Sequence, residues 1–381
     1  MESGTLYRQL QQHLDRMPIG FPATESGVEI RILRQLFTPE EAELTLEASA
    51  IPEPAATIHR RTRAMTLAEV TNLLNQMADK GLILRIHARR EPLYAKLIFA
   101  VGFYERQLKR LTPELERDCR EYILGAYAQA SHSKKTTQLR TVPVNKTIAI
   151  ERNVATYENI RGYVESHGGP FATMDCICRH GRELLGEKCT QTSLKENCLT
   201  LGVAAREMVR IGQARSISRE NTLELLDAAD KEGLVLQPEN TRNPLFVCCC
   251  CGCCCGVLTS AKRFPQPAEY FSANFQAEVD ADLCDACGVC QSRCQMDALV
   301  DGDGGAGGPG DGKPRVDHAR CIGCGLCVTT CPSGALRLAE KAQRKVPPDD
   351  TKALYMQLLQ ERYGPWGMAK LAGRKLLGMK F

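Results

Sequence analysis

The chain has 381 residues, and its 49 lysines and arginines nearly balance 45 aspartates and glutamates, which leaves a formal charge of +4. This balance gives no global electrostatic case for nucleic-acid binding. No run of about 18 apolar residues is present, which excludes a transmembrane helix, and residues 1–17 lack the apolar stretch of a secretory signal. The unusual feature is a total of 20 cysteines, nineteen of them between Cys176 and Cys331. Because we expect the chain in the reducing cytoplasm, crowded cysteines predict metal binding before disulfides.

Residues 1–115 contain no cysteine and are expected to form a domain of their own. Residues 5–17 gather four apolar side chains on one helical face: Leu6, Leu10, Leu14 and Met17. Later helices are predicted to begin at two capping boxes, Thr38 with Glu41 and Thr66 with Glu69. The second helix has a predicted apolar face of Leu67, Val70, Leu73, Leu74 and Met77.

The second helix is expected to end at Gly81, and residues 82–97 then alternate as a hairpin does. This order over residues 30–100 resembles a winged helix-turn-helix domain. The resemblance implies DNA binding, but the would-be recognition helix carries Glu69 and no Arg or Lys in its first turns. We therefore expect a wing domain that docks a protein or serves as a dimerisation face, with specific DNA binding as the alternative.

Residues 116–275 are expected to form a cysteine-rich α/β domain, with a strand-like run over 138–150 and helices beginning at Thr156 and Ser218. It shows no nucleotide-binding fingerprint. Four cysteines within 23 residues are enough for one metal centre: Cys176, Cys178, Cys189 and Cys198. Zinc accepts the same four ligands as an iron–sulfur cluster, so the sequence leaves both open. We expect the nearby Arg179, His180, Arg182 and Lys188 to form a solvated basic loop rather than to donate to sulfur.

Seven cysteines then fall within eight positions: Cys248, Cys249, Cys250, Cys251, Cys253, Cys254 and Cys255. Adjacent side chains point in different directions, so the run is expected to serve more than one centre or to mix ligands with core thiols. Seven neighbouring thiols without metal would invite oxidation. Among the eleven cysteines from Cys176 to Cys255 we expect one or two further iron–sulfur or zinc centres in all, with a subset of this run among the ligands.

The last cysteines form two runs with the spacing C-x2-C-x2-C-x3-C, the second followed by Pro332. This segment, residues 278–340, resembles the bacterial dicluster ferredoxin family, in which the fourth cysteine of each run binds the other cluster. The resemblance implies one [4Fe-4S] cluster at Cys284, Cys287, Cys290 and Cys331. It implies a second at Cys321, Cys324, Cys327 and Cys294. Gln295 departs from the family's proline, and a glycine-rich insertion over 301–314 is expected to be a surface connection.

Residues 341–381 form a basic tail with Lys370, Arg374, Lys375 and Lys380. It predicts an amphipathic helix for a membrane surface or an acidic partner, or a helix docked on its own domain. The fold class is therefore a multidomain α/β (α+β) protein: a winged-helix-like domain 1–115, a cysteine-rich domain 116–275, a ferredoxin module 276–340 and the tail.

The cysteine pattern as a whole resembles a family of iron–sulfur proteins of anaerobic bacteria, described as 4Fe-4S dicluster-containing proteins. We expect no catalytic residue, and an electron-transfer protein or subunit that serves an oxidoreductase or a low-potential donor. One alternative is a redox-responsive DNA-binding regulator, and another is a reductase with an open iron site among residues 248–255. The sequence leaves the oligomeric state open.

Overall fold

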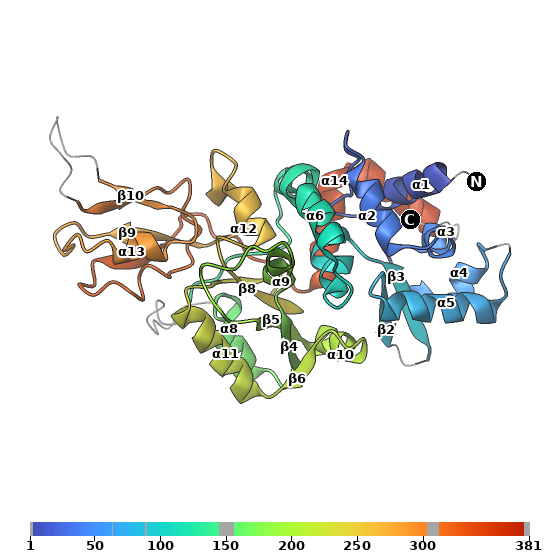
Figure 1. Ribbon diagram of the computed structural model, residues 1–381, viewed down its shortest axis with the longest axis horizontal. Coiled ribbons are helices and arrows are strands. Elements are labelled where there is room, and N and C mark those ends of the chain that lie inside the picture. Colours follow the sequence, from blue (N-terminus) through green and yellow to red (C-terminus); the bar gives the residue numbers. More distant parts are fainter. Residues whose placement is uncertain (1–2, 63, 88–89, 145–155, 303–311, 377–381) are drawn as a thin grey trace.

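The computed structural model describes residues 3–62, 64–87, 90–144, 156–302 and 312–376. The molecule is elongated and mixes helices with strands (Figure 1). The N-terminal helices lie at one end, and a five-stranded sheet lies in the middle (Figure 1). The segment that carries the cysteines from Cys284 to Cys331, with its short strands, lies at the other end (Figure 1). None of the described helices has the length and apolar character needed to cross a bilayer.

The N-terminal unit is made of helices and one small sheet of order β1-β3-β2, in which all pairings are antiparallel. Its elements are α1 (Ser3–Asp15), α2 (Val28–Leu36), α3 (Pro39–Glu47), β1 (Glu53–Pro54), α4 (Ala55–His59), α5 (Leu67–Asp79), β2 (Ile83–His87) and β3 (Pro92–Lys96). The predicted hairpin is therefore present, although its tip at residues 88–89 lies outside the described residues. The predicted face of α1 is buried as expected.

Both predicted capping boxes are confirmed. Thr38 is the N-cap of α3 and Thr66 is the N-cap of α5, and each hydroxyl accepts from the backbone N–H of the glutamate three residues later. Each glutamate accepts in return from the backbone N–H of its threonine, so the first turn is closed from both sides. The predicted apolar face of α5 is buried at Val70, Leu74 and Met77, partly buried at Leu73 and exposed at Leu67. Leu67 is the first residue of the helix, and its side chain is 44% exposed.

The first hydrophobic core does not end at residue 115, where the sequence suggests a domain limit. It continues through Leu115, Cys119, Tyr122 and Tyr127. These residues belong to the next helical segments, which are η1 (Phe99–Phe103), η2 (Glu105–Gln107), α6 (Pro113–Tyr122), η3 (Ile123–Tyr127) and α7 (Ala128–His132). An aromatic cluster around Phe99 links the segments, with ring centroids 5.2 Å apart to both Tyr122 and Tyr127.

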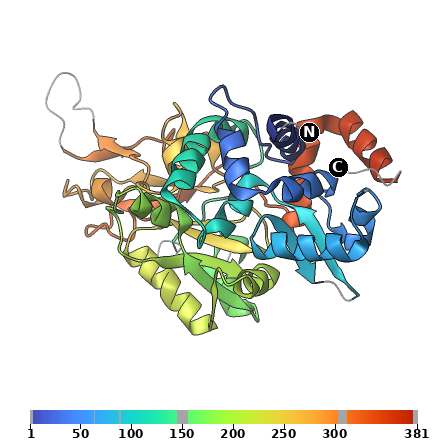
Figure 2. The same ribbon diagram turned by 45° about the vertical axis from the view of Figure 1, so that its right-hand side comes forward.

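The C-terminal helix α14 (Thr351–Leu376) packs beside the N-terminal helices (Figure 2). Leu354 and Leu358 enter the first core, and Arg362 donates to the Met17 carbonyl at 2.8 Å. Residues 351–362 therefore dock on the chain's own body, whereas the basic residues that predict an amphipathic helix come after them. The helix kinks at Gly364, and beyond the kink the ring of Trp366 is 90% exposed. Lys380 lies outside the described residues.

The middle of the molecule is an antiparallel sheet of order β6-β4-β5-β8-β7. Its strands are β4 (Phe171–Asp175), β5 (Glu196–Leu201), β6 (Arg215–Ile217), β7 (Val235–Pro238) and β8 (Phe246–Cys250). The accompanying helices are η5 (Thr156–Glu158), α8 (Ile160–Ser166), α9 (Ile177–Leu184), α10 (Gly202–Arg210), α11 (Arg219–Lys231), α12 (Gly256–Ala261) and η6 (Pro267–Tyr270). Helices α8 and α11 cover one face, while α9 lies on the other face beside α6 (Figure 1).

The predicted cap at Ser218 is confirmed, because its hydroxyl accepts from the Asn221 N–H at the start of α11. The cap predicted at Thr156 is wrong. Helix α8 begins after Asn159, whose side chain accepts from the Gly162 N–H at 2.9 Å. Asn is an equally good capping residue, so the composition did not separate the two positions. Part of the predicted strand 138–150, residues 145–150, lies outside the described residues.

Glu239 follows β7 and ties the middle domain to the start of α14. Its Oε2 accepts from the Leu245 N–H and from the Thr351 hydroxyl, both at 3.0 Å. Burial raises the pKa of this carboxyl to about 7, against the effect of these hydrogen bonds.

The C-terminal module, defined here as residues 275–340, consists of two strand pairs around the regular cysteine runs. Its elements are β9 (Phe275–Val279), α13 (Val289–Arg293), β10 (Leu299–Asp301), β11 (Pro314–Val316) and β12 (Leu336–Glu340). Strand β9 pairs with β12, and β10 pairs with β11, both antiparallel. The second hydrophobic core runs without a break from the middle sheet into this module. Residues 303–311 of the glycine-rich insertion lie outside the described residues.

Candidate metal centres

The eight cysteines of the C-terminal module surround two hollows. The first hollow is lined by Cys284, Cys287, Cys290 and Cys331. The second hollow is lined by Cys321, Cys324, Cys327 and Cys294. Each hollow thus takes three thiols from one run and one from the other. The structure brings together the two sets that the ferredoxin resemblance implies.

In the loops around these hollows the backbone passes close to neighbouring segments, which requires glycine. Gly323 has a φ of +66°, and a Cβ at this residue would lie 2.1 Å from the Phe275 carbonyl oxygen. Backbone amides point at the sulfurs, from the Ala277 N–H to Cys321 Sγ at 3.4 Å and from the Ala298 N–H to Cys294 Sγ at 3.3 Å. Such donors stabilise a thiolate that holds iron.

The two hollows differ in their access to solvent. Cys287 at the first hollow is exposed, whereas Cys321 and Cys327 at the second are buried. Burial raises the pKa of Cys324 to about 12, so this thiol would stay protonated without a metal. The first hollow therefore has one exposed thiol, and the second has none.

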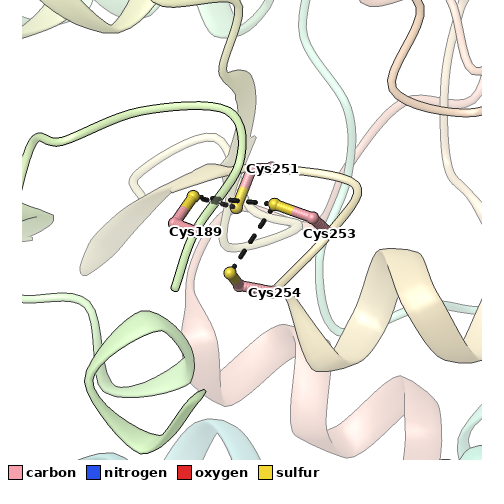
Figure 3. A group of neighbouring side chains, drawn as sticks. All are labelled: Cys189, Cys251, Cys253 and Cys254. Atoms are coloured by element: carbon pink, nitrogen blue, oxygen red, sulfur yellow. Dashed lines mark hydrogen bonds between the residues drawn. The ribbon is translucent and has the colours of Figure 1, made fainter. Parts of the chain in front are cut away.

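A compact group of four thiols lies in the middle domain, and we call it the four-thiol group: Cys189, Cys251, Cys253 and Cys254 (Figure 3). All four sulfurs lie within 4.8 Å of one another. Cys189 comes from the loop after α9, and the other three come from the turn between β8 and α12. The Cys189 sulfur lies 3.7 Å from that of Cys251 and 3.6 Å from that of Cys253. Hydrogen bonding from Cys254 lowers the pKa of Cys251 to about 4 despite burial.

Six other thiols form a looser group, which we call the six-thiol group: Cys176, Cys178, Cys198, Cys248, Cys250 and Cys255. Cys198 of β5 lies directly across from Cys248 of β8, and the alternation of the strand places Cys250 on the same face. Cys176 precedes α9 and Cys255 precedes α12. The thiols interact in a continuous chain, in the order 176–178–255–250–248–198. Hydrogen bonds from Cys178 and Cys250 lower the pKa of Cys255 to about 6.

These two groups differ from the ligand set expected within residues 176–198. The structure separates Cys189 from Cys176, Cys178 and Cys198 and places it with three thiols of the later run. Spacing along the chain did not reveal this, because Cys189, in the loop between α9 and β5, lies against the β8–α12 turn. The expectation that the run 248–255 serves more than one group agrees with the arrangement. Cys249 points to the opposite face of β8, where it is buried in the second core.

Arg179 lies between the two groups, contrary to the expectation of a solvated loop. It is buried, its Nη1 lies 3.7 Å from the Cys251 sulfur, and its Nη2 donates to Asn197 and to the Cys249 carbonyl. Burial lowers the pKa of Arg179, but the nearby cysteines outweigh burial and hold it above the usual value. Its position one residue after the C-x-C pair was the available signal, because the first turn of α9 carries it toward the sheet.

The C-terminal module meets the four-thiol group through Gln295, the residue that replaces the family's proline. The Gln295 Oε1 accepts from the Gly252 N–H at 2.7 Å, and its Nε2 donates to Gln191 Oε1 at 2.9 Å. Gly252 lies between Cys251 and Cys253, and Gln191 lies two residues after Cys189. A Cβ at Gly252 would lie 2.4 Å from the Gln295 carbonyl oxygen, so the two backbones are in close contact. A glutamine here serves the junction, since a proline side chain offers neither hydrogen bond.

The comparisons with known proteins agree with the hollows of the C-terminal module. The family model of the 4Fe-4S binding domain matches residues 314–337, a segment that contains Cys321, Cys324, Cys327 and Cys331. No curated protein matches the chain. The chain therefore carries an iron–sulfur, ferredoxin-like module near its C-terminal end, with a site for at least one [4Fe-4S] cluster.

Proposed function

We propose that this protein is an iron–sulfur electron-transfer protein or subunit that relays single electrons to an oxidoreductase partner in the cytoplasm. Its module holds two [4Fe-4S] clusters, one at Cys284, Cys287, Cys290 and Cys331, and one at Cys321, Cys324, Cys327 and Cys294. The carrying observation is that two separate hollows are each lined by four thiols drawn from both runs. Each cluster accepts or donates one electron when bound, and the residues around it set its potential through burial and amide donors.

The first cluster is the contact point for a redox partner. Its ligand Cys287 is exposed, and it is flanked by two exposed apolar side chains, Leu283 at 55% and Val289 at 41%. Exposed apolar residues beside a cofactor are typical of a surface that binds another protein transiently. An electron received here passes to the second cluster, because both lie in one small module that shares its core.

The second cluster is directed toward the middle domain. The Cys324 carbonyl accepts from the Val144 N–H at 3.0 Å, and Gln295, next to Cys294, reaches the Cys251–Cys254 turn. These contacts support electron transfer from the second cluster into the cysteine-rich domain.

The six-thiol group is the candidate for a further iron–sulfur centre. A [4Fe-4S] cluster needs four thiolates, and the group offers six, with low pKa values at Cys248 and Cys255. The Gly256 N–H donates to Cys178, and the Leu258 N–H donates to Cys255. Backbone amides donate to the module cysteines in the same way. These contacts suit thiolates in a metal centre. We propose that four of the six bind the cluster.

The N-terminal unit is a winged-helix-like domain that docks a protein. The order of α3, α4, α5 and the β2–β3 hairpin, with β1 added at the edge, supports this assignment. The start of α5 carries the carboxylate of Glu69, held there by Thr66, and a negative charge at this point repels DNA phosphates. A sequence-selective gel shift that weakens as salt is raised would instead support the DNA-binding regulator.

The cluster assignment is tested by two double variants purified anaerobically. Cys284→Ser with Cys331→Ser removes two ligands of one proposed cluster, so about four irons and four sulfides are lost. Cys284→Ser with Cys294→Ser removes one ligand from each of the two proposed clusters, so we expect the loss of about eight irons. If all four cysteines of each run bound one cluster instead, the second double variant would lose one cluster and the first double variant would lose two. Cys119→Ser is the control, because Cys119 is buried in the first core.

Electron transfer is tested on the same preparations. Stepwise reduction of the wild-type protein should bleach the cluster absorbance and produce electron paramagnetic resonance signals from both reduced clusters. A protein that retains its iron and sulfide but takes up no electrons at low potential would contradict the proposal.

A further inference from the structure

The four-thiol group differs from the eight thiols of the module in the spacing of its sulfurs. Three of its sulfur pairs lie at 3.7, 3.6 and 3.6 Å. Among the described residues, the thiols of the module form no comparably tight group and instead surround the two hollows. Sulfurs in direct contact and sulfurs around a hollow call for different occupants.

The observed spacing fits a single metal ion. A tetrahedral site with metal–sulfur bonds of about 2.3 Å places its sulfurs about 3.8 Å apart. A [4Fe-4S] cube separates its ligands by four irons and four sulfides, which sulfurs in contact do not admit. Four cysteines in this arrangement are typical of zinc, and iron accepts the same ligands.

We infer that Cys189, Cys251, Cys253 and Cys254 bind one divalent ion, zinc or iron, without inorganic sulfide. Zinc and iron share this tetrathiolate chemistry, and metal analysis distinguishes them. The inference goes beyond the proposed electron-transfer function and does not depend on the clusters of the module.

The surroundings suit a tetrathiolate ion. Four thiolates around a divalent ion leave two negative charges, and the buried guanidinium of Arg179 lies 3.7 Å from the Cys251 sulfur. Backbone amides donate to the ligands, from Gln191 and Thr192 to Cys189 and from Cys254 to Cys251. Both kinds of donor are typical of structural metal sites.

The ion would hold the loop after α9 against the β8–α12 turn. These are the two segments that Gln295 contacts, through Gln191 on the loop and Gly252 on the turn. One ion at this point therefore fixes the surface on which the C-terminal module sits.

The first test uses the wild-type protein, purified anaerobically, with iron, zinc and sulfide measured per chain. Because [4Fe-4S] clusters contain equal iron and sulfide, the sum of iron and zinc should exceed sulfide by about one. Equal metal and sulfide would overturn the inference, whatever the total. Less iron and sulfide than two clusters require, together with one metal ion in excess of sulfide, would refute the proposed function and leave this inference intact.

The second test compares two variants of the cysteine-rich segments. Cys189→Ser should remove about one metal ion with no loss of sulfide, whereas loss of about four irons and four sulfides would overturn the inference. Cys249→Ala is the matched control, because Cys249 lies beside the ligands but points into the second core. Unchanged circular dichroism and an unchanged melting temperature show that each variant is folded. If Cys189→Ser does not fold, the metal excess in the wild type still decides.

Discussion

Gln295 provides two of the hydrogen bonds that join the C-terminal module to the middle domain, so Gln295→Ala should loosen this junction. The substitution removes two hydrogen bonds, at 2.7 Å from Gly252 and at 2.9 Å to Gln191, and leaves the Gly252 N–H without its protein acceptor. A neutral hydrogen bond contributes about 0.5–1.5 kcal/mol, and an unsatisfied buried donor costs about 1–3 kcal/mol. Because Gly252 is partly exposed, we expect the lower part of this range, about 2 kcal/mol for opening the junction.

Amide hydrogen exchange measures this opening directly. A loss of 2 kcal/mol corresponds to roughly 30-fold faster exchange of the amides around the Cys251–Cys254 turn, where exchange reports local opening. Gln291→Ala is the control, because it removes an exposed bond to Asp301 within the same module, and such surface changes stay within about 0.5 kcal/mol. Equal exchange in the two variants would refute the account of the junction.

Three further predictions follow from particular residues. The pKa of Glu239 is raised to about 7, so the folded state binds a proton more tightly than the unfolded state, and stability falls as pH rises from about 4.5 to 7. Glu239→Gln should flatten the fall in melting temperature over this range. An unchanged slope of melting temperature against pH would contradict this prediction. Gly323→Ala should lose about four irons because its Cβ meets a β9 carbonyl oxygen, whereas Gly334→Ala, with φ of +69° and no neighbour within 4 Å, should retain them. Arg179→Gln should lower the midpoint potential of the cluster proposed for the six-thiol group by roughly 60 mV, the equivalent of about 1.4 kcal/mol for one electron, because the Arg179 charge interacts with Cys176 and Cys250. Arg182 is paired with a surface carboxylate, so Arg182→Gln should leave this potential unchanged in a redox titration.

Local signals in the sequence predicted local structure well. The capping boxes at Thr38 and Thr66 and the cap at Ser218 are present because each involves residues at most three positions apart. The two sets of module cysteines also lie together as implied, since their spacing belongs to a known loop geometry. Where two capping residues lay close together, as at Thr156 and Asn159, the sequence did not decide between them.

Contacts between distant segments were beyond the reach of the sequence. The pairing of Cys189 with the β8–α12 turn depends on the path of the loop after α9, and no spacing rule encodes that path. The burial of Arg179 follows from the packing of α9 on the sheet, which turns a basic position into an internal one. Gln295 was visible as a departure from a family pattern, but its role required knowing that Gly252 lies opposite.

Iron and acid-labile sulfide per chain, measured on protein purified without oxygen, test the central claim most directly. Two clusters in the C-terminal module require at least about eight irons and eight sulfides, and a further cluster in the six-thiol group raises both to about twelve. A value well below eight in a preparation that retains its metal would contradict an electron-transfer protein built on two [4Fe-4S] clusters.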